Sequence, residues 1–280
     1  MSFVVAVGRC IRHSSRPGSS IRPTPLGRSV QIVGYRSAVD GPAELVIAED
    51  GTVRRESLEP GTDVAYTLEE RHCAGTITDE RHVVCGVRDA PYCPQHRDRW
   101  PCARCQGDCD LPLESCREEH AIYLAAFAPD HFKVGVTRSW RLETRLREQG
   151  ADRAAHVRTV ENGRIARQIE MDIAESVGDS VRVDHKLAGL HRSVKEAAWE
   201  RLLADFDVLE RFDFEYGLDL IDRPVAETLL TGTIRGTKGR VLVLQRNGTA
   251  YGVDMRNLVG HVIVESETDR DLQTSLGSFN

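Results

Sequence analysis

The sequence predicts an α+β protein built around a central β-β-α-β-α unit. Two short β-type runs, residues 122–124 and 132–137, flank a Pro129-Asp130 turn, which is the pattern of a β-hairpin. Seven of the eight cysteines lie in one segment ahead of this hairpin. Further β-type runs separated by glycines lie near both ends of the chain, and the two groups could together form one small barrel.

These observations divide the 280 residues into five expected segments. They are an N-terminal β region at 1–71, a cysteine-rich zinc-binding segment at 72–120, an α/β core with an extra helix at 121–222, a C-terminal β region at 223–266 and a flexible tail at 267–280.

Both terminal regions are expected to be β-structure. Asp50-Gly51 lies between two apolar runs and predicts the turn of a hairpin. The N-terminal strands are expected at 3–7, 30–35, 44–48, 52–58 and 64–68. The C-terminal strands are expected at 228–234, 240–244, 249–253 and 258–264, with tight-turn residues between them.

The cysteine-rich segment has the spacing of a zinc-binding module. Cys93-x2-His96 and Cys102-x2-Cys105 are chelating pairs, because a two-residue gap lets one tight turn present two ligands to a tetrahedral ion. The segment is too polar to build its own core, so a metal would have to hold it together. The candidate ligands of one or two structural Zn²⁺ ions are Cys73, Cys85, Cys93, His96, Cys102, Cys105, Cys109, Cys116 and His120.

Two arrangements of these ligands remain open. In the first, two ions bind, and His120 is able to replace one of the other ligands. The two sets are then Cys73, Cys85, Cys93 and His96 for one ion and Cys102, Cys105, Cys109 and Cys116 for the other. In the second arrangement, the two chelating pairs form a single site. His72 and His82 are expected to be exposed to solvent rather than ligands.

The second half of the central unit is a strand at 155–160 and a helix at about 162–176. Asn162 is suited to cap this helix. Isoleucines recur every four residues along it and give it an apolar seam. Glu170 lies beside the seam, where it could reach the edge of a cleft. The simpler alternative is a structural glutamate that lies at the surface or pairs with an arginine.

A further helix is predicted at 193–210. Ser193 and Glu196 have the spacing of a capping box. The buried face of this helix is expected to comprise Trp199, Leu202, Leu203, Phe206 and Leu209.

Charge is unevenly distributed along the chain. Between residues 133 and 167, nine basic side chains accompany four acidic ones, although the whole chain carries −6. Such a positive island is typical of a surface that binds an anion, most often phosphate. Arg138, Arg141 and Arg145 are expected to share one side of a helix. The expected nucleic-acid-binding residues are Lys133, Arg138, Arg141, Arg145 and Arg147. A solvated, arginine-rich helix face is the simpler alternative.

Neither a membrane span nor a secretory signal is apparent. No apolar run approaches the roughly 18 residues needed to cross a bilayer. The apolar run near the start is too short for a secretory signal. We therefore expect a cytoplasmic protein with no membrane partner.

Nearly the whole chain resembles domain-of-unknown-function family 2797. The resemblance is most specific at residues 133–138, 145–151 and 232–244, and its members also carry a cysteine cluster ahead of the hairpin. This resemblance implies no particular activity.

Residues 121–176 also resemble the GIY-YIG nuclease domain. Ala121-Ile122-Tyr123 stands where the GIY motif would, and Lys133-Val134-Gly135 where YIG would. The resemblance implies a β-β-α-β-α fold.

The nuclease resemblance also implies catalytic roles. Tyr123 would help to activate water, Arg145 would steady the phosphate and Glu170 would hold Mg²⁺ or Mn²⁺. Lys133 replaces the second tyrosine of the motifs, and it can bind phosphate without doing the acid–base work of a tyrosine. The spacing after Gly135 is longer than usual, so Arg141 competes with Arg145 for the arginine role.

Three functions are consistent with these patterns. The first is a zinc-containing nucleic-acid-binding protein with a slight preference for RNA, because a zinc module beside a small β-structure suits single-stranded or structured RNA. The second is a divalent-metal-dependent phosphodiesterase. The third is a non-enzymatic scaffold whose zinc segment binds a protein partner.

Overall fold

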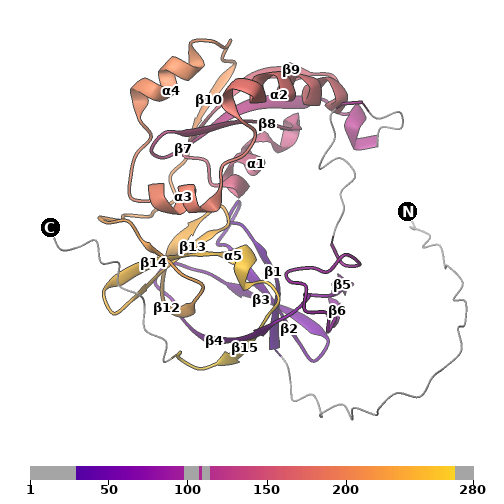
Figure 1. The fold of residues 1–280 in the computed structure, drawn as a ribbon, viewed down its shortest axis with the longest axis vertical. Helices are drawn as coiled ribbons and strands as arrows, with labels where there is room; N and C mark the ends of the chain where they lie inside the picture. The colour runs from indigo at the N-terminus through magenta and orange to yellow at the C-terminus, as the bar shows by residue number, and fades with distance from the viewer. Residues whose placement is uncertain (1–29, 98–106, 109–113, 269–280) are drawn as a thin grey trace, which may run out of the picture.

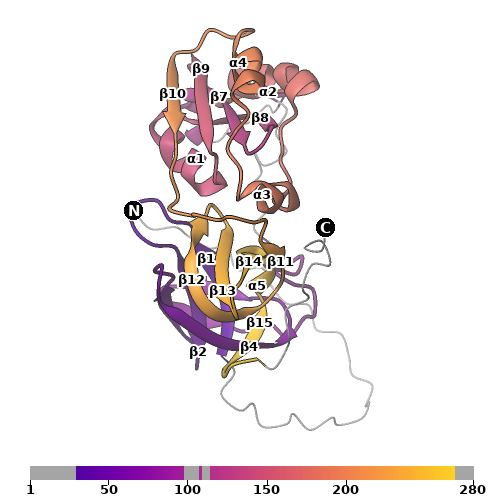
Figure 2. The same ribbon diagram turned by 90° about the vertical axis from the view of Figure 1, so that its left-hand side faces the viewer.

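The computed structural model describes residues 30–97, 107–108 and 114–268 and shows an α+β protein with two β-sheets. One sheet has eleven strands and the other has four, and Figure 2 shows them as two bodies stacked one above the other. The expected strand at 3–7, the ligands Cys102, Cys105 and Cys109, and most of the expected tail lie outside the described residues.

The eleven-stranded sheet combines strands from both ends of the chain (Figure 1). Its N-terminal strands are β1 (Val30–Arg36), β2 (Glu44–Glu49), β3 (Thr52–Ser57), β4 (Asp63–Arg71), β5 (Thr76–Thr78) and β6 (Arg81–Val83). Asp50 and Gly51 form the β2–β3 turn with positive φ angles, as expected for a tight hairpin. The short β5–β6 hairpin, which no sequence pattern indicated, lies inside the cysteine-rich segment.

The C-terminal elements are β11 (Val225–Ala226), β12 (Leu230–Lys238), β13 (Val241–Arg246), β14 (Thr249–Asp254), α5 (Met255–Leu258) and β15 (His261–Glu265). β15 lies between β1 and β4, and β12 pairs with the other edge of β4. The sheet is open, with β11 and β5 at its two ends, so the suggested closed barrel is wrong. The expectation that the two terminal regions complete one structure is confirmed.

The four-stranded sheet contains the central unit. Its elements are η2 (Glu114–Arg117), β7 (His120–Phe127), β8 (His131–Arg138), η3 (Ser139–Arg141), α1 (Leu142–Gln149), β9 (Arg153–Val160), α2 (Gly163–Val177), α3 (Val183–Gly189), α4 (Glu196–Leu203) and β10 (Glu210–Asp213). The order β7, β8, α1, β9, α2 confirms the predicted β-β-α-β-α succession, and the strands lie in the order β10-β9-β7-β8. Asn162 caps α2 by accepting hydrogen bonds from the amides of Arg164 and Ile165.

Apolar side chains of β7 alternate between the two faces of this sheet. Tyr123 and Phe127 lie on the face that packs against Leu146 of α1. Ile122 and Leu124 lie on the opposite face, in the cluster that includes side chains of α2 and α4. The functional candidates on β7 and α1 therefore share the Tyr123 face.

Three local expectations are wrong. Arg138 ends β8 and Arg141 ends η3, so only Arg145 of the three arginines belongs to α1. The helix predicted at 193–210 is the shorter α4, whose N-cap is Lys195 and makes no side-chain capping bond. Leu209 lies beyond that helix and is 60% exposed.

The two sheets meet at the loop after α1 and at the β12–β13 turn. Gly150 and Gly239 both have positive φ angles, and a Cβ atom built on Gly239 would lie 2.6 Å from the Gly150 nitrogen. Lys238 forms an ion pair with Asp152 at 2.5 Å across this contact. α3 lies at the same junction (Figure 1), where Leu187 packs against strand β13. No described helix is long and apolar enough to cross a membrane.

Candidate metal centre and basic cluster

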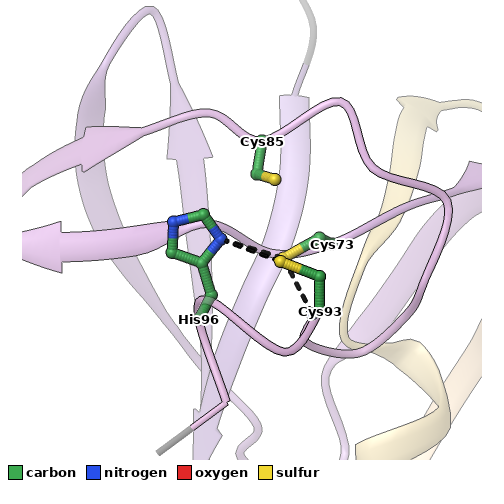
Figure 3. Close-up of side chains that lie close together, drawn as sticks. All are labelled: Cys73, Cys85, Cys93 and His96. Atoms are coloured by element: carbon green, nitrogen blue, oxygen red, sulfur yellow. Dashed lines mark hydrogen bonds between the residues drawn. The ribbon is translucent and has the colours of Figure 1, made fainter. Parts of the chain in front are cut away.

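Three thiols and one imidazole come together beside the β5–β6 hairpin (Figure 3). They belong to Cys73, Cys85, Cys93 and His96, and their ligand atoms all lie within 4.8 Å of one another. These four residues are the set that the sequence analysis assigned to one of two ions. Cys93 and His96 are thus grouped with Cys73 and Cys85, whereas a single site made of the two chelating pairs would draw on Cys102 and Cys105, outside the described residues.

Backbone hydrogen bonds position the four side chains. Cys73 follows β4, and the β5–β6 hairpin returns the chain so that Cys85 lies beside it. A tight turn, in which the amide of His96 donates to the Cys93 carbonyl at 3.0 Å, presents the remaining pair. The Cys73 amide donates to the Val87 carbonyl at 2.8 Å and fixes the loop between them.

Hydrogen-bond donors surround the sulfur atoms. The backbone amides of Cys93 and Gly75 donate to the Cys73 Sγ at 3.2 and 3.4 Å. Burial opposes ionisation of Cys93, but hydrogen bonds from the Gln95 and His96 amides stabilise its thiolate and lower the pKa of Cys93 to about 7. Burial raises the pKa of Cys73. Three sulfur ligands and one imidazole form a donor set that zinc prefers in closed structural sites.

Two histidines support this cluster from outside it. His82 is buried, which contradicts the expectation of solvent exposure, and its Nε2 lies 2.8 Å from the Ala74 carbonyl. The Nδ1 of His72 lies 2.8 Å from the Cys85 carbonyl. Such outer contacts hold the backbone that carries the ligands. Spacing alone could not reveal them, because both partners are backbone atoms.

Cys116 of η2 and His120 of β7 are not part of the Cys₃His cluster, and their side chains lie beside the first residue of α2. A Cβ atom built on Gly163 would lie 3.0 Å from the Nε2 of His120 and 3.2 Å from the Sγ of Cys116. The other members of the second expected set are outside the described residues. Of the candidate ligands for a second ion, the structure therefore brings together Cys116 and His120, while Cys102, Cys105 and Cys109 lie outside the described residues.

A second group of functional candidates surrounds Tyr123. The Tyr123 ring is buried, and its hydroxyl accepts a hydrogen bond from the Gln149 Nε2 at 2.5 Å. Burial raises the pKa of Tyr123, and the neighbouring Arg145 and Glu170 act on it with opposite signs. Gln149 of α1 therefore meets Tyr123 of β7 at this hydroxyl, and the charges of Arg145 and Glu170 act on it.

Lys133 of β8 belongs to the same group. It pairs across the hairpin with Ala125, which lies on the Tyr123 face. Burial and the positive charge of Arg145 lower the pKa of Lys133 to about 8, while Glu170 opposes this change. We call Tyr123, Lys133, Arg145 and Glu170 the basic cluster.

Most arginines near the basic cluster have acidic partners. Arg141 and Arg145 both contact Glu148, at 2.9 and 3.2 Å. The other two expected binding arginines are also paired: Arg138 with Glu118 at 3.3 Å, and Arg147 with Glu143 at 2.9 Å. The positive island is therefore partly neutralised, and Arg147 lies over the Phe214 ring instead of joining the basic cluster.

Two residues of this site were not found from the sequence. Arg167 donates to the carboxylate of the buried Glu170 at 2.6 Å, and Gln149 donates to Tyr123. The three-residue spacing between Arg167 and Glu170 on one helix could have indicated the first contact. The Gln149 contact joins the end of α1 to β7 and had no local signal.

The fold and site thus define an α+β protein with a Cys₃His cluster that could hold a metal ion such as zinc. The family model described as "Protein of unknown function (DUF2797)" matches residues 96–263, and the chain belongs to this family. The match covers the central unit and most of the C-terminal strands, but of the Cys₃His cluster it includes only His96. Neither a search of curated proteins nor a search of solved structures gave a match.

Proposed function

We propose that this chain is a zinc-containing nucleic-acid-binding protein whose basic cluster contacts phosphate. The observation that carries the proposal is the half-buried Lys133, which pairs across the hairpin with Ala125 on the Tyr123 face and on which the charges of Arg145 and Glu170 both act. A half-buried lysine beside an arginine is costly unless an anion offsets their charge. Phosphate is an anionic group that both arginine and lysine bind well.

The zinc part of the proposal rests on the Cys₃His cluster. Zinc would hold the loops after β4 and β6 in place, because they have little apolar core of their own beyond the cysteines. A structural role follows from the four ligands, which would close a tetrahedral shell. RNA remains slightly preferred over duplex DNA as the ligand.

A GIY-YIG-like arrangement of the central unit is part of the same proposal. Its support is the β-β-α-β-α order and the position of Tyr123 directly across the hairpin from Gly135. Lys133 takes the place of the second motif tyrosine and supplies a positive charge there. That charge favours phosphate binding over proton transfer.

The test is fluorescence anisotropy with labelled structured RNA, single-stranded DNA and duplex DNA. We expect Arg145→Ala to weaken binding and to reduce the slope of log K against log salt by about one, as expected for one lost phosphate contact. Arg201→Ala is the matched control, because Arg201 is an exposed arginine on α4. Unchanged binding in an Arg141→Ala/Arg145→Ala double variant would refute the proposal.

A metal-dependent phosphodiesterase is the second candidate, and the buried Glu170 carboxylate favours it. Glu170 could hold Mg²⁺ or Mn²⁺ while Arg145 stabilises charge on the phosphate. It ranks second because Arg167 already occupies one Glu170 oxygen at 2.6 Å. The raised pKa of Tyr123 also keeps its hydroxyl protonated at neutral pH.

Cleavage assays with Mg²⁺ or Mn²⁺ separate the two candidates. Metal-dependent cleavage that is lost in Glu170→Gln but kept in Glu175→Gln would make the chain a nuclease. Glu175 is an exposed glutamate on the same helix. Binding without cleavage supports the nucleic-acid-binding function.

A further inference from the structure

Lys186 is a cation of α3, and α3 is not part of the β-β-α-β-α unit. Its Nζ donates to the carbonyl oxygen of Gln149 at 2.7 Å and lies 4.1 Å from the centre of the Phe127 ring. Phe127 and Tyr123 are on the same face of β7. Gln149 contacts Tyr123 through its side chain and Lys186 through its backbone. Lys186 therefore lies beside the basic cluster.

The charged groups that act most strongly on Lys186 are all positive. They are Lys133, Arg240, Lys238 and Arg145, in that order. Among the described residues, no carboxylate forms a salt bridge with Lys186. Burial and these like charges lower the pKa of Lys186 to about 7.

Three of these neighbouring cations are already compensated. Arg145 contacts Glu148 at 3.2 Å, Lys238 contacts Asp152 at 2.5 Å and Arg240 contacts Asp254 at 2.9 Å. Lys133 differs, because its Nζ donates to the backbone carbonyl of Asp179 at 2.8 Å and forms no salt bridge with a described carboxylate, so the charges of Glu170 and Asp179 offset its own only in part.

Lys133 and Lys186 both lie on the Tyr123 face of β7, because Lys133 pairs across the hairpin with Ala125 and Lys186 lies over the ring of Phe127, two residues further along the same face. They are two half-buried ammonium groups that are hydrogen-bonded to backbone carbonyl oxygens. Each ammonium has three N–H donors, so both keep donors for a further acceptor. Two such like charges held together are unfavourable without an anion.

We propose that Lys186 and Lys133 together bind one phosphate group, so that the anion site lies between the four-stranded sheet and α3. This inference rests on the proposed function and names the group of the ligand that enters the site. A phosphate group has several oxygens that can accept from both ammonium groups at once. Its negative charge offsets the repulsion between the two lysines.

The location has a structural consequence. α3 packs on β13 of the eleven-stranded sheet through Leu187, and a Cβ atom on Gly252 would lie 2.3 Å from a Leu187 methyl carbon. Lys238 and Arg240 of the β12–β13 turn are already paired with Asp152 and Asp254. The eleven-stranded sheet therefore contributes by supporting α3, whereas the β-β-α-β-α unit alone would lack Lys186.

The experiment compares wild type with Lys186→Met, Lys186→Arg and the control Lys195→Met. Lys195 is an exposed lysine paired with Asp130, so its loss removes the same charge away from the site. The probes are inorganic pyrophosphate, measured by isothermal titration calorimetry, and a labelled single-stranded oligonucleotide with or without a 5′-phosphate, measured by anisotropy. Thermal unfolding monitored by circular dichroism shows that each variant is folded.

We expect Lys186→Met to weaken binding of pyrophosphate and oligonucleotide about tenfold, the order of one charge-assisted hydrogen bond. Lys186→Arg and Lys195→Met should bind nearly as wild type does. A gain in affinity from the 5′-phosphate would identify a terminal phosphate, and equal affinities would identify an internal phosphodiester.

The outcomes separate the two proposals. Lys186-dependent pyrophosphate binding without oligonucleotide binding would keep the phosphate site and remove the nucleic-acid function. Oligonucleotide binding that needs Arg145 but is unchanged in Lys186→Met would keep the function and overturn this inference. If wild type binds neither probe, both proposals fall.

Discussion

Tyr123 lies directly across the β7–β8 hairpin from Gly135, and a Cβ atom built on Gly135 would lie 2.5 Å from the Tyr123 hydroxyl oxygen. The Gly135 backbone does not have a positive φ angle, so the tyrosine ring, rather than the main chain, requires glycine there. This contact places the hydroxyl beside Gln149 and Arg145. Packing against Gly135 and the hydrogen bond from Gln149 thus hold one side chain of the basic cluster in place.

Gly135→Ala should destabilise the protein by about 1–3 kcal/mol, because an added methyl group overpacks a buried site. Urea unfolding would measure the change. Gly34→Ala is the control, since its added Cβ atom would lie at an ordinary contact distance of 3.5 Å from Val46. Tyr123→Val should remove most of the cost of Gly135→Ala. Additive effects of the two substitutions would contradict this account of the glycine.

Zinc removal should unfold the segment around the Cys₃His cluster. We expect Cys73→Ser to lower the zinc content by one ion per chain and to destabilise the protein by at least about 3 kcal/mol, because ligand loss removes metal-coupled folding energy. Elemental analysis and thermal unfolding would measure both effects. Cys116→Ser should keep the ion at the Cys₃His cluster, since Cys116 belongs to η2 and is not one of the four ligands. Full zinc content in Cys73→Ser would show that the cluster is not a metal site.

The contact between the sheets should depend on the Lys238–Asp152 ion pair. Lys238 is only 7% exposed, and the second Asp152 oxygen accepts from the Ala128 amide at 2.8 Å. Lys238→Met leaves a carboxylate without its cation in a partly buried position and should cost about 3 kcal/mol. Urea unfolding of Lys238→Met, Asp152→Asn and the double variant would give the coupling energy. A coupling energy near zero would mean that the pair does not hold the sheets together.

Lys186 should make stability depend on pH in a definite direction. Its pKa is lowered to about 7 in the folded protein, from the ordinary lysine value of 10.5. Between these values the unfolded chain binds more protons, so the contribution of Lys186 to stability rises with pH. Below pH 7 the repulsion among the cations acts in full.

The free energy of unfolding of wild type, relative to Lys186→Met, should therefore rise by on the order of 1 kcal/mol between pH 7 and 9. Urea unfolding at several pH values would measure it. The difference in free energy of unfolding between wild type and Lys195→Met should stay constant over this range and serves as the reference. Pyrophosphate should reduce the slope, because the anion favours the protonated lysine. If the free energy of unfolding of wild type relative to Lys186→Met fell with rising pH, burial and the neighbouring positive charges would not be lowering the pKa of Lys186.

Local patterns in the sequence were enough to predict the secondary structure of the central unit. Two β-type runs around the Pro129-Asp130 turn identify the β7–β8 hairpin. Four-residue apolar spacing identifies α2, and Asn162 marks where α2 begins. The charge count did not show that Arg138, Arg141 and Arg147 have acidic partners. Ion pairing depends on which side chains meet, and a window sum does not contain that information.

The sequence by itself determined the α+β class, the order of the central elements and the residue types able to bind metal, because each of these follows from spacing within a short window. Only the tertiary structure decided that β15 enters between β1 and β4, that Cys73 and Cys85 join Cys93 and His96, and that Lys186 lies against Phe127 and Gln149. These arrangements arise from packing between segments far apart in the chain. Such packing is set by shape and burial across the whole molecule and leaves no periodic signal along it.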